Sequence, residues 1–480
     1  MVLPVRLRPT EKRIDFFARE RFNGDGGRPM KLVSLLTLGG AFLLLELSVF
    51  GQGSLTPPAA PTPTMKTLDQ VKAGTPIGSA PYTISSSGNY FLTGDLSVGS
   101  GNTAITINSS GVTLDLNGFT ITSTSSPAAG TAILINGAFT DVTILNGHIV
   151  SSVTYSGGTY SGNGFQNGIS SPSSPLNVRV SGVTVSGVSN QGIYLANTTS
   201  SVVDSCIVHV AGASGIYAAT VNNSTADVCG AFAIYGGATT SNCYGSSNGS
   251  GGIWTPNANN CYGYTTANSA NGLTATNAIN CYGVSNANSS TGSGLFCFSG
   301  SNCYGFNFSN SASSYGINAF SVSNCYGFAT GIGINAYNAE NCSGASNDSY
   351  GLYAAYSATG CYGSSSGSIG LFARIATNCY GTTTASSDGL NAFSATNCFG
   401  NCSNTGTGIG LFATNANNCY GITSGTSYGL FASTSAIACV GQSNSGTGLF
   451  ANIVYACYGI GSPNLSGHQY FCGSGANPYP

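Results

Sequence analysis

The feature that most constrains the fold is a repeat in which one half keeps its length while the other half varies. The phrase Gly-Leu-Phe-Ala-Thr-Asn-Ala-Asn-Asn-Cys-Tyr-Gly at 410–421 returns, with changes, at 333–344, 370–381 and 389–400. Its Leu or Ile precedes its Cys by eight or nine residues, and successive Cys residues of these repeats lie 17 to 22 residues apart. A fixed segment joined to a variable one predicts a solenoid with loops on one side.

The repeat favours strands over helices. Helical repeats need about 33 residues or more, and Gly, Ser, Thr and Asn are poor helix formers. In nearly every turn from Ile193 to Leu449 an Ile or Leu follows the first Gly, the next position varies, and the third is usually Ala. Because side chains alternate along a strand, the Leu and Ala positions should face inward. We therefore expect an all-β chain that forms one parallel β-helix, right-handed because parallel crossovers almost always are.

The N-terminal part of the chain predicts export. Residues 1–29 are rich in Arg and show no periodicity, whereas 32–50 form an apolar run that ends in small residues. This pattern is typical of a secretory signal peptide over 1–51, with 1–29 as an over-extended start. The alternative is a retained membrane anchor. Glu46 disfavours it, since an acid at the centre of a spanning helix costs about 2.5–3.5 kcal/mol.

Four further segments complete the expected organisation. Residues 52–64 contain four Pro residues and predict an extended linker. Residues 65–81, beginning with a short helix, are expected to cap the first turn, because an open solenoid end exposes unpaired backbone. The β-helix itself is expected over 82–460, and 461–480 as a C-terminal tail.

Four short stretches near the start of the repeats carry a resemblance to a known family. They are 68–71 (Leu-Asp-Gln-Val), 74–77 (Gly-Thr-Pro-Ile), 88–96 and 112–118. Together they resemble the opening of secreted right-handed parallel β-helix repeat proteins of environmental bacteria, uncharacterised members of the pectate-lyase-like superfold. The resemblance implies the fold and a secreted or cell-surface location. It implies no particular activity, because that superfold hosts lyases, hydrolases, adhesins and structural rods.

Charge limits the partners. Charged residues make up only 5% of the chain, and after residue 52 there are four basic and nine acidic residues, a net charge of −5. No basic patch for nucleic acid and no polybasic segment for anionic lipid is present in the sequence. We expect neutral glycans or surface proteins as partners, no cofactor, and membrane contact only through an uncleaved N-terminal segment.

The cysteines of the repeat predict a stacked column that starts at Cys206 and passes through Cys229. Metal binding is disfavoured because the sequence has no Cys-x-x-Cys and only three His. Stacked Cβ atoms would stay about 4.8 Å apart, beyond the ~3.8 Å of a disulfide. Buried thiols are favoured over a disulfide series, with Cys398 and Cys402 as the expected exceptions. The structural ladder is predicted to comprise Cys243, Cys261, Cys281, Cys303, Cys325, Cys342, Cys361, Cys379, Cys398, Cys419, Cys439 and Cys457.

An aromatic residue follows most of these cysteines and should face outward. Stacking of these rings between turns would stabilise the sheet, and this interpretation is favoured. The alternative is a platform for sugar rings or a partner surface, because exposed apolar stripes usually mark contacts. Tyr362, Tyr380 and Tyr420 are the candidate binding residues.

Two acids are the candidates for catalysis. Asp204 and Asp227 each lie two residues before a Cys, so they are expected to stack about 5 Å apart in adjacent turns, with His209 near them. Such a pair could bind calcium or act as acid and nucleophile. The alternative is two exposed turn acids that repel each other mildly in water.

Three classes of function remain open. The sequence favours a non-catalytic extracellular or cell-surface β-helix, which acts as a structural rod or as a scaffold that binds glycans or proteins. The Ser-, Asn- and Thr-rich arcs offer neutral hydrogen bonds to such partners without a strong acid–base pair. The alternatives are a polysaccharide lyase or glycoside hydrolase of the same superfold, and a component that polymerises through its ends.

Overall fold

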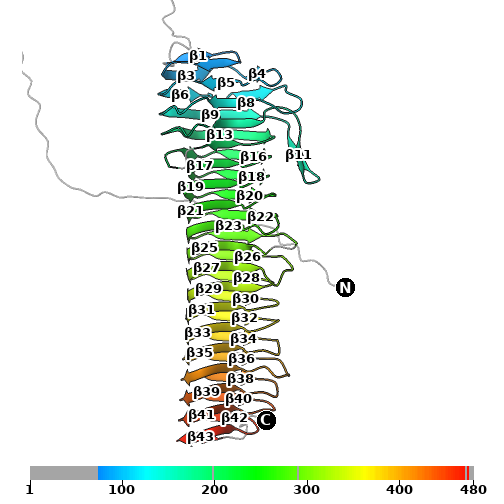
Figure 1. The fold of residues 1–480 in the computed structure, drawn as a ribbon, viewed down its shortest axis with the longest axis vertical. Helices are drawn as coiled ribbons and strands as arrows, with labels where there is room; N and C mark the ends of the chain where they lie inside the picture. Colours follow the sequence, from blue (N-terminus) through cyan, green and yellow to red (C-terminus); the bar gives the residue numbers. More distant parts are fainter. Residues whose placement is uncertain (1–73, 197–198, 289–290, 471–472, 475–480) are drawn as a thin grey trace, which may run out of the picture. The chain divides into compact units, whose positions relative to one another are not determined.

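The described residues form one parallel β-solenoid. The computed structural model describes residues 74–196, 199–288, 291–470 and 473–474, and these contain strands and no helix. The strands stack in chain order through about 19 turns (Figure 1). The predicted fold class is confirmed, while its right-handed sense stays a prediction. The predicted signal peptide, linker and short cap helix lie outside the described residues.

The first turns carry three short strands each and extend the solenoid beyond its predicted start. β1 pairs with β3 in parallel, so pairing begins at Thr75, inside the range expected to be a cap. The early strands are β1 (Thr75–Ile77), β2 (Tyr82–Ile84), β3 (Gly88–Leu92), β4 (Leu96–Val98), β5 (Ile105–Ile107), β6 (Val112–Asp115), β7 (Thr120–Ser123), β8 (Thr131–Ile135), β9 (Val142–Val150), β12 (Asn167–Ser171), β13 (Arg179–Val188), β14 (Ile193–Leu195), β15 (Val202–Asp204) and β16 (Ile207–Ala211).

From Ile216 onward each turn has two strands, and the longer one forms what we call the long-strand face. It continues both β14 and β15, which pair with successive halves of β17. This face comprises β17 (Ile216–Asn222), β19 (Ile234–Ser241), β21 (Ile253–Asn259), β23 (Leu273–Ile279), β25 (Ser293–Ser301), β27 (Tyr315–Ser323), β29 (Ile332–Glu340), β31 (Leu352–Thr359), β33 (Leu371–Thr377), β35 (Leu390–Thr396), β37 (Leu411–Asn417), β39 (Leu430–Ile437), β41 (Leu449–Tyr455) and β43 (Leu465–Tyr470).

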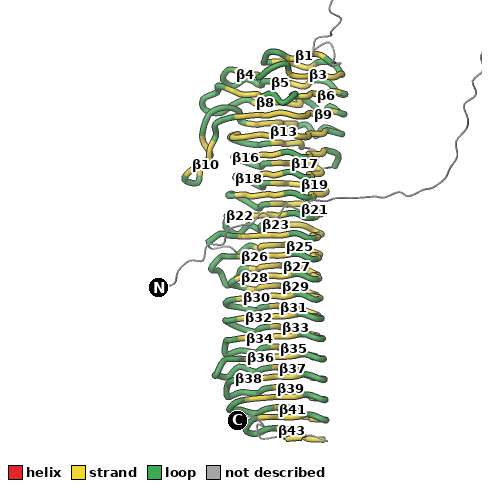
Figure 2. Tube along the Cα trace, turned by 180° about the vertical axis from the view of Figure 1, so that it is seen from behind, coloured by secondary structure: helices red, strands yellow, loops and turns green. Residues whose placement is uncertain are grey.

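The shorter strand of each turn forms the short-strand face. The larger loops, which connect this face to the next turn, gather along one side of the stack (Figure 2). The face comprises β18 (Thr225–Cys229), β20 (Tyr244–Ser247), β22 (Tyr262–Thr265), β24 (Tyr282–Ser285), β26 (Tyr304–Asn307), β28 (Tyr326–Ala329), β30 (Ser343–Ser346), β32 (Tyr362–Ser365), β34 (Tyr380–Thr383), β36 (Phe399–Cys402), β38 (Tyr420–Thr423), β40 (Val440–Ser443), β42 (Tyr458–Ile460) and β44 (Gly473–Ser474).

One hairpin departs from the solenoid. β10 (Thr154–Ser156) and β11 (Thr159–Ser161) pair antiparallel, and the rings of Tyr155 and Tyr160 lie 4.7 Å apart. A Cβ added at Gly230 would lie 3.0 Å from Tyr160 Cε2, so the hairpin rests against later turns. Figure 1 shows it alongside the stack.

The core consists of rows of similar side chains along the axis. The leucine row consists of the Leu or Ile at or near the start of each strand of the long-strand face, and its members from β17 to β41 are fully buried, Leu371 and Leu390 included. Two residues further along the strand a second inward row is mostly Ala, such as Ala354 and Ala373. The inward alternation predicted from the repeat is confirmed. Within the described residues, no helix is long and apolar enough to cross a membrane.

Candidate functional site

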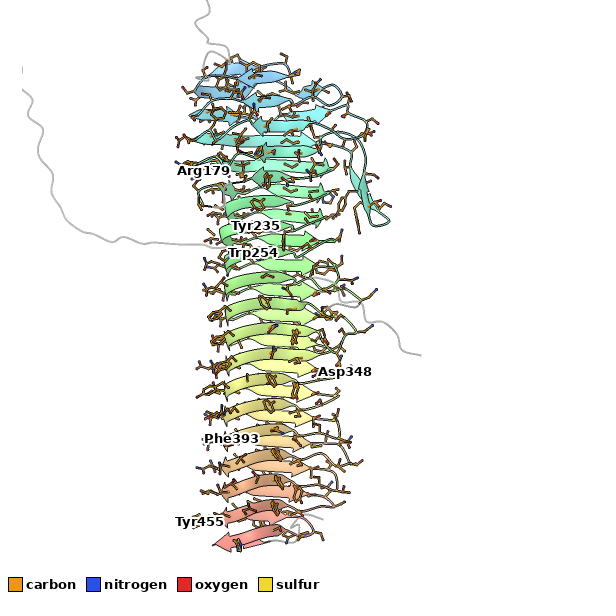
Figure 3. All side chains as sticks on the ribbon, in the orientation of Figure 1. Arg179, Tyr235, Trp254, Asp348, Phe393 and Tyr455 are labelled. Atoms are coloured by element: carbon orange, nitrogen blue, oxygen red, sulfur yellow. The ribbon has the colours of Figure 1, made fainter. Side chains whose placement is uncertain are left out.

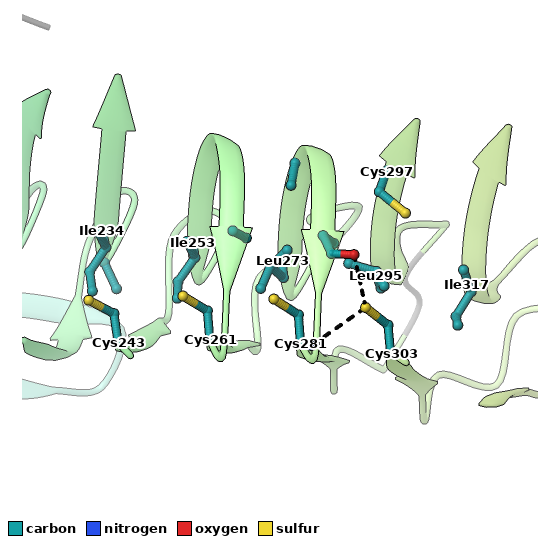
Figure 4. Close-up of a cluster of buried hydrophobic side chains, with 14 of the residues drawn as sticks. Ile234, Cys243, Ile253, Cys261, Leu273, Cys281, Leu295, Cys297, Cys303 and Ile317 are labelled. Carbon is teal, nitrogen blue, oxygen red and sulfur yellow. Dashed lines mark hydrogen bonds between the residues drawn. The ribbon is translucent and has the colours of Figure 1, made fainter. Parts of the chain in front are cut away.

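The twelve predicted cysteines form one continuous ladder inside the solenoid. Each directly precedes a strand of the short-strand face, and those strands pair in register from β20 to β42. Successive members are linked by weak hydrogen bonds, for example Cys281 N to Cys303 Sγ at 3.5 Å and Cys303 N to Cys325 Sγ at 3.4 Å. Figure 4 shows the first four members beside the leucine row.

Two other cysteines were assigned to the wrong row or partner. Cys229 pairs with Ser247 of the next turn, and Cys402 with Thr383 and Thr423, so both belong to a second buried row that is mostly Ser and Thr. Pairing of Ile207 with Thr225 places Ser224 after Cys206 in the ladder row, and the ladder then resumes at Cys243. The predicted column through Cys229 is therefore wrong.

All sixteen cysteines of the described residues are buried, and none is in a disulfide. This includes Cys398 and Cys402, which the sequence analysis expected to be exceptions to the buried, unpaired thiols. Burial raises the pKa of Cys206 to about 11 and that of Cys297 to about 12. Within the ladder, hydrogen bonding to Cys325 together with burial raises the pKa of Cys342 to about 12. Since the thiolate is the nucleophile, the raised pKa makes Cys206, Cys297 and Cys342 unreactive near neutral pH. The ladder as a whole is protected by its burial, because hydrogen bonds between its thiols lower the pKa of other members such as Cys261 and Cys379.

We expect the cysteines of the ladder to resist alkylation in the native protein. Iodoacetamide should leave them unmodified before unfolding and modify them fully in guanidinium chloride without any reductant, as read by peptide mass mapping. Free thiols that appear only on unfolding are the result expected for buried, reduced side chains. If labelling after unfolding required a reductant, the ladder would be a disulfide series and the description of the core would be wrong.

The structure does not bring the two candidate acids together. Asp227 pairs with His209 across β16 and β18, and His209 Nδ1 lies 2.7 Å from Asp227 Oδ1. Asp204 pairs instead with Asn222. Its Oδ1 accepts a hydrogen bond from Asn223 Nδ2 at 3.0 Å. The predicted stacking of Asp204 on Asp227 is wrong, because the cysteines used to align them lie in different rows. What remains is a solvent-exposed His–Asp pair.

A row of asparagines was missed by the sequence analysis. The residue before the ladder cysteine is Asn in nine turns, and it adopts the left-handed backbone conformation, for example Asn242 at φ 54° and Asn260 at φ 52°. Asn tolerates this conformation better than most residues. The side chains bond to one another along the axis, from Asn260 Nδ2 to Asn242 Oδ1 at 3.2 Å and from Asn242 Nδ2 to Asn223 Oδ1 at 3.1 Å. The repeated Asn-Cys dipeptide was its signal.

The tyrosines that follow the cysteines stack along the short-strand face. Ring centroids lie 5.2 Å apart for Tyr362 and Tyr380, and Phe399 meets Tyr420 edge-on at 5.3 Å. Ser343 and Val440 occupy the row in two turns and interrupt it. The rings therefore stack as one sequence interpretation expected. Whether Tyr362, Tyr380 and Tyr420 also bind a ligand stays a prediction.

A second set of aromatic rings occupies the position directly after each residue of the leucine row. The residue type at this position varies along the sequence. We call it the post-leucine row. Tyr235 and Trp254 are stacked with centroids 4.4 Å apart, and Figure 3 shows the two residues one above the other. Short polar side chains interrupt this row at several turns. Its members are Tyr194, Tyr217, Tyr235, Trp254, Thr274, Phe296, Asn318, Asn335, Tyr353, Phe372, Asn391, Phe412, Phe431 and Phe450.

The first interruption opens a pocket of about 400 Å³ on the long-strand face, which we call the aromatic pocket. One side is formed by Trp254, Thr274 and Phe296 of the post-leucine row. Phe298 and Phe320, exposed and stacked at 4.8 Å, form the other side. The floor and remaining polar groups come from Thr255, Ala275, Thr276, Cys297, Asn318 and Ala319. None of these described lining residues carries a charge.

The floor of the aromatic pocket shows a compensated change in the repeat. Cys297 takes the place that Ala275 and Ala319 occupy in the turns on either side. Gly300 takes the place of Ala278 and Val322. A Cβ at Gly300 would lie 3.1 Å from Cys297 Sγ, so the glycine makes room for the sulfur. The turn therefore accommodates the larger side chain of Cys297 in the core while it presents both Phe296 and Phe298 outside.

Comparison with protein family models, curated proteins and solved structures finds no match to the chain. The family resemblance of the early turns thus stays a prediction. Within the described ranges, no group of three or more His, Cys, Asp or Glu side chains is close enough to hold a metal ion. The aromatic pocket is therefore the feature from which we argue function.

Proposed function

We propose that the protein is a non-catalytic scaffold that binds neutral glycans through the aromatic pocket. The single observation that carries the proposal is the pocket itself, a hollow of about 400 Å³ with aromatic walls and only hydroxyl and amide groups for polar contact. Ligand sites are typically pockets of about 300–1,000 Å³, mostly apolar with a few placed polar groups. A pyranose ring offers apolar C–H faces to Trp254 and Phe296 and hydroxyl groups to Thr274 and Asn318.

The charges of the molecule support a neutral ligand. Beyond residue 52 the sequence has two Lys and two Arg, so little attraction for a polyanion is available. The proposal includes export through residues 1–51 and a right-handed coil, in keeping with the family resemblance. One alternative is that the same surface binds a protein partner. Another is that the glycan binds to the tyrosines of the short-strand face, Tyr362, Tyr380 and Tyr420.

Filling the aromatic pocket should weaken binding strongly. We expect the purified protein to be retarded in affinity gels that contain a neutral polysaccharide, such as hydroxyethyl cellulose, xyloglucan, mixed-linkage β-glucan or galactomannan, more than in gels with polygalacturonate. Thr274→Phe places a ring between Trp254 and Phe296 and should weaken binding at least tenfold, about 1.4 kcal/mol. Thr382→Phe is the matched control, because it adds the same side chain in a row of the short-strand face that already contains Phe306 and Phe328.

Other results would replace the proposal. Binding that survives Thr274→Phe but is lost when Tyr362, Tyr380 and Tyr420 are changed to Ser would move the site to the short-strand face. Release of oligosaccharides that disappears in Asp227→Asn would make the protein a polysaccharide-cleaving enzyme. Absence of binding to every neutral polysaccharide would leave a structural rod.

A further inference from the structure

A second gap of a single residue, after the one at Thr274, interrupts the post-leucine row at Asn391. Strand pairing places Phe372, Asn391 and Phe412 side by side in three successive turns. On both sides of the gap the rings are stacked, with centroids 5.0 Å apart for Tyr353 and Phe372 and 5.3 Å apart for Phe412 and Phe431. Asn391 therefore stands where one more ring would make this part of the post-leucine row a continuous aromatic stack.

The gap has the width of one ring. Neighbouring parallel strands lie about 4.8 Å apart, so Phe372 and Phe412 are separated by about 10 Å, two strand spacings. A six-membered ring placed midway would lie about 5 Å from each, which is the spacing that stacked rings prefer. The same order of ring, short polar side chain and ring forms one wall of the aromatic pocket at Trp254, Thr274 and Phe296.

The base of this gap is polar in a way that the neighbouring turns are not. Asn391 Nδ2 donates a hydrogen bond to Asp388 Oδ2 at 2.7 Å. Asp388 is half-buried at the position where the adjacent turns have Ile369 and Ile409. Burial raises the pKa of its carboxyl, an effect that hydrogen bonds from the Asn391 side chain and the Ile409 backbone partly offset. Two polar side chains that bond to each other thus stand where the turns on either side have an aromatic ring and an isoleucine.

We propose that the gap at Asn391 is a second site for one pyranose ring of a neutral glycan. The ring stacks between Phe372 and Phe412, and its hydroxyl groups bond to the Asp388 carboxylate and the Asn391 amide. This site rests on the proposed function. Six turns separate Asn391 from Thr274 along the long-strand face, about 29 Å at ~4.8 Å per turn. One extended glycan that reaches both sites would gain affinity by avidity.

The test is a substitution that places an aromatic ring in the gap of the post-leucine row. Asn391→Phe should keep the melting temperature at or above that of the unsubstituted protein and lower its affinity for neutral polysaccharide in the same affinity gels by about tenfold, because the second contact of an avid pair is lost. Asn391→Ala leaves the gap open and should lower the affinity for neutral polysaccharide less than Asn391→Phe does. Thr382→Phe again serves as the control for an added ring and should leave binding unchanged.

The outcomes separate this site from the proposed function. If Thr274→Phe abolishes binding while Asn391→Phe changes nothing, the second site is wrong and the aromatic pocket stands. If the unsubstituted protein binds no neutral polysaccharide, both proposals are wrong. If Asn391→Phe removes the binding of an apolar dye but not of polysaccharide, the occupant of the gap is not a sugar.

Discussion

Replacing Gly363 by Ala is expected to open the solenoid around β32. A Cβ there would lie 2.8 Å from both the carbonyl carbon of Gly370 and Leu371 Cβ, and closer still to Gly370 O. Overpacking against side chains costs about 1–3 kcal/mol. The cost should exceed that range here because backbone atoms have no alternative rotamer. The expected result is a lower melting temperature and rapid amide exchange in the turns from β31 to β35.

The neighbouring residue supplies the control for this prediction. Ser364 already carries a Cβ and is half-buried on the outer side of β32, so Ser364→Ala should change stability by no more than about 0.5 kcal/mol. Most turns repeat the arrangement, with the glycine after the aromatic residue facing the glycine before the leucine. Equal melting temperatures for Gly363→Ala and Ser364→Ala would show that the two faces are not as close as described.

Leu371→Ala is expected to have the second large effect. Leu371 is fully buried in the leucine row, between Leu352 and Leu390 of the adjacent turns. Such a truncation in a core costs about 2–5 kcal/mol, from lost burial and the cavity left behind. In a repeat protein the loss also weakens the interfaces with both neighbouring turns. Denaturant unfolding should move to lower concentration, with amide protection lost first in β31, β33 and β35.

Arg374 lies on the same strand and tests whether the effect follows burial. Its side chain is exposed, so Arg374→Ala should stay within about 0.5 kcal/mol of the unsubstituted protein. A loss of stability for Arg374→Ala as large as that for Leu371→Ala would contradict the assignment of inside and outside on the long-strand face.

The rows of the core were predictable because the segment between the leucine and the cysteine has nearly constant length. With eight or nine residues in each turn from Ile234 to Leu449, an alignment of Leu371 with Leu390 also aligns Cys379 with Cys398. Alternation within a strand then decides which side chains face inward. The twelve-membered ladder and the buried Ala row follow from this regularity, and both are confirmed.

The prediction was wrong where a turn departs from the regular pattern. Ser224 stands in the ladder row between Cys206 and Cys243, and Cys229 lies five residues later in another row. Counting back from the nearest cysteine therefore placed Asp227 in register with Asp204, although the two residues do not pair. Only the strand pairing shows that Asp227 lies beside His209.

The aromatic pocket was missed for a different reason. Its residues come from neighbouring turns, and each turn taken alone shows an outward position of variable chemistry. The order Trp254, Thr274, Phe296 becomes meaningful only when the turns are stacked, since the short side chain then separates two rings. The width of such a gap is set by the strand spacing, which the residue types alone do not reveal.

The most direct test of the account is a fluorescence titration, because Trp254 is the only tryptophan in the sequence and forms a wall of the aromatic pocket. Addition of cellohexaose, xylohexaose or mannohexaose should give a saturable change in emission with at least one of them. Thr274→Phe should remove that change, and Thr382→Phe should keep it. Emission that stays constant with all three sugars, or a response that Thr274→Phe leaves intact, would contradict the assignment of the pocket as the glycan site.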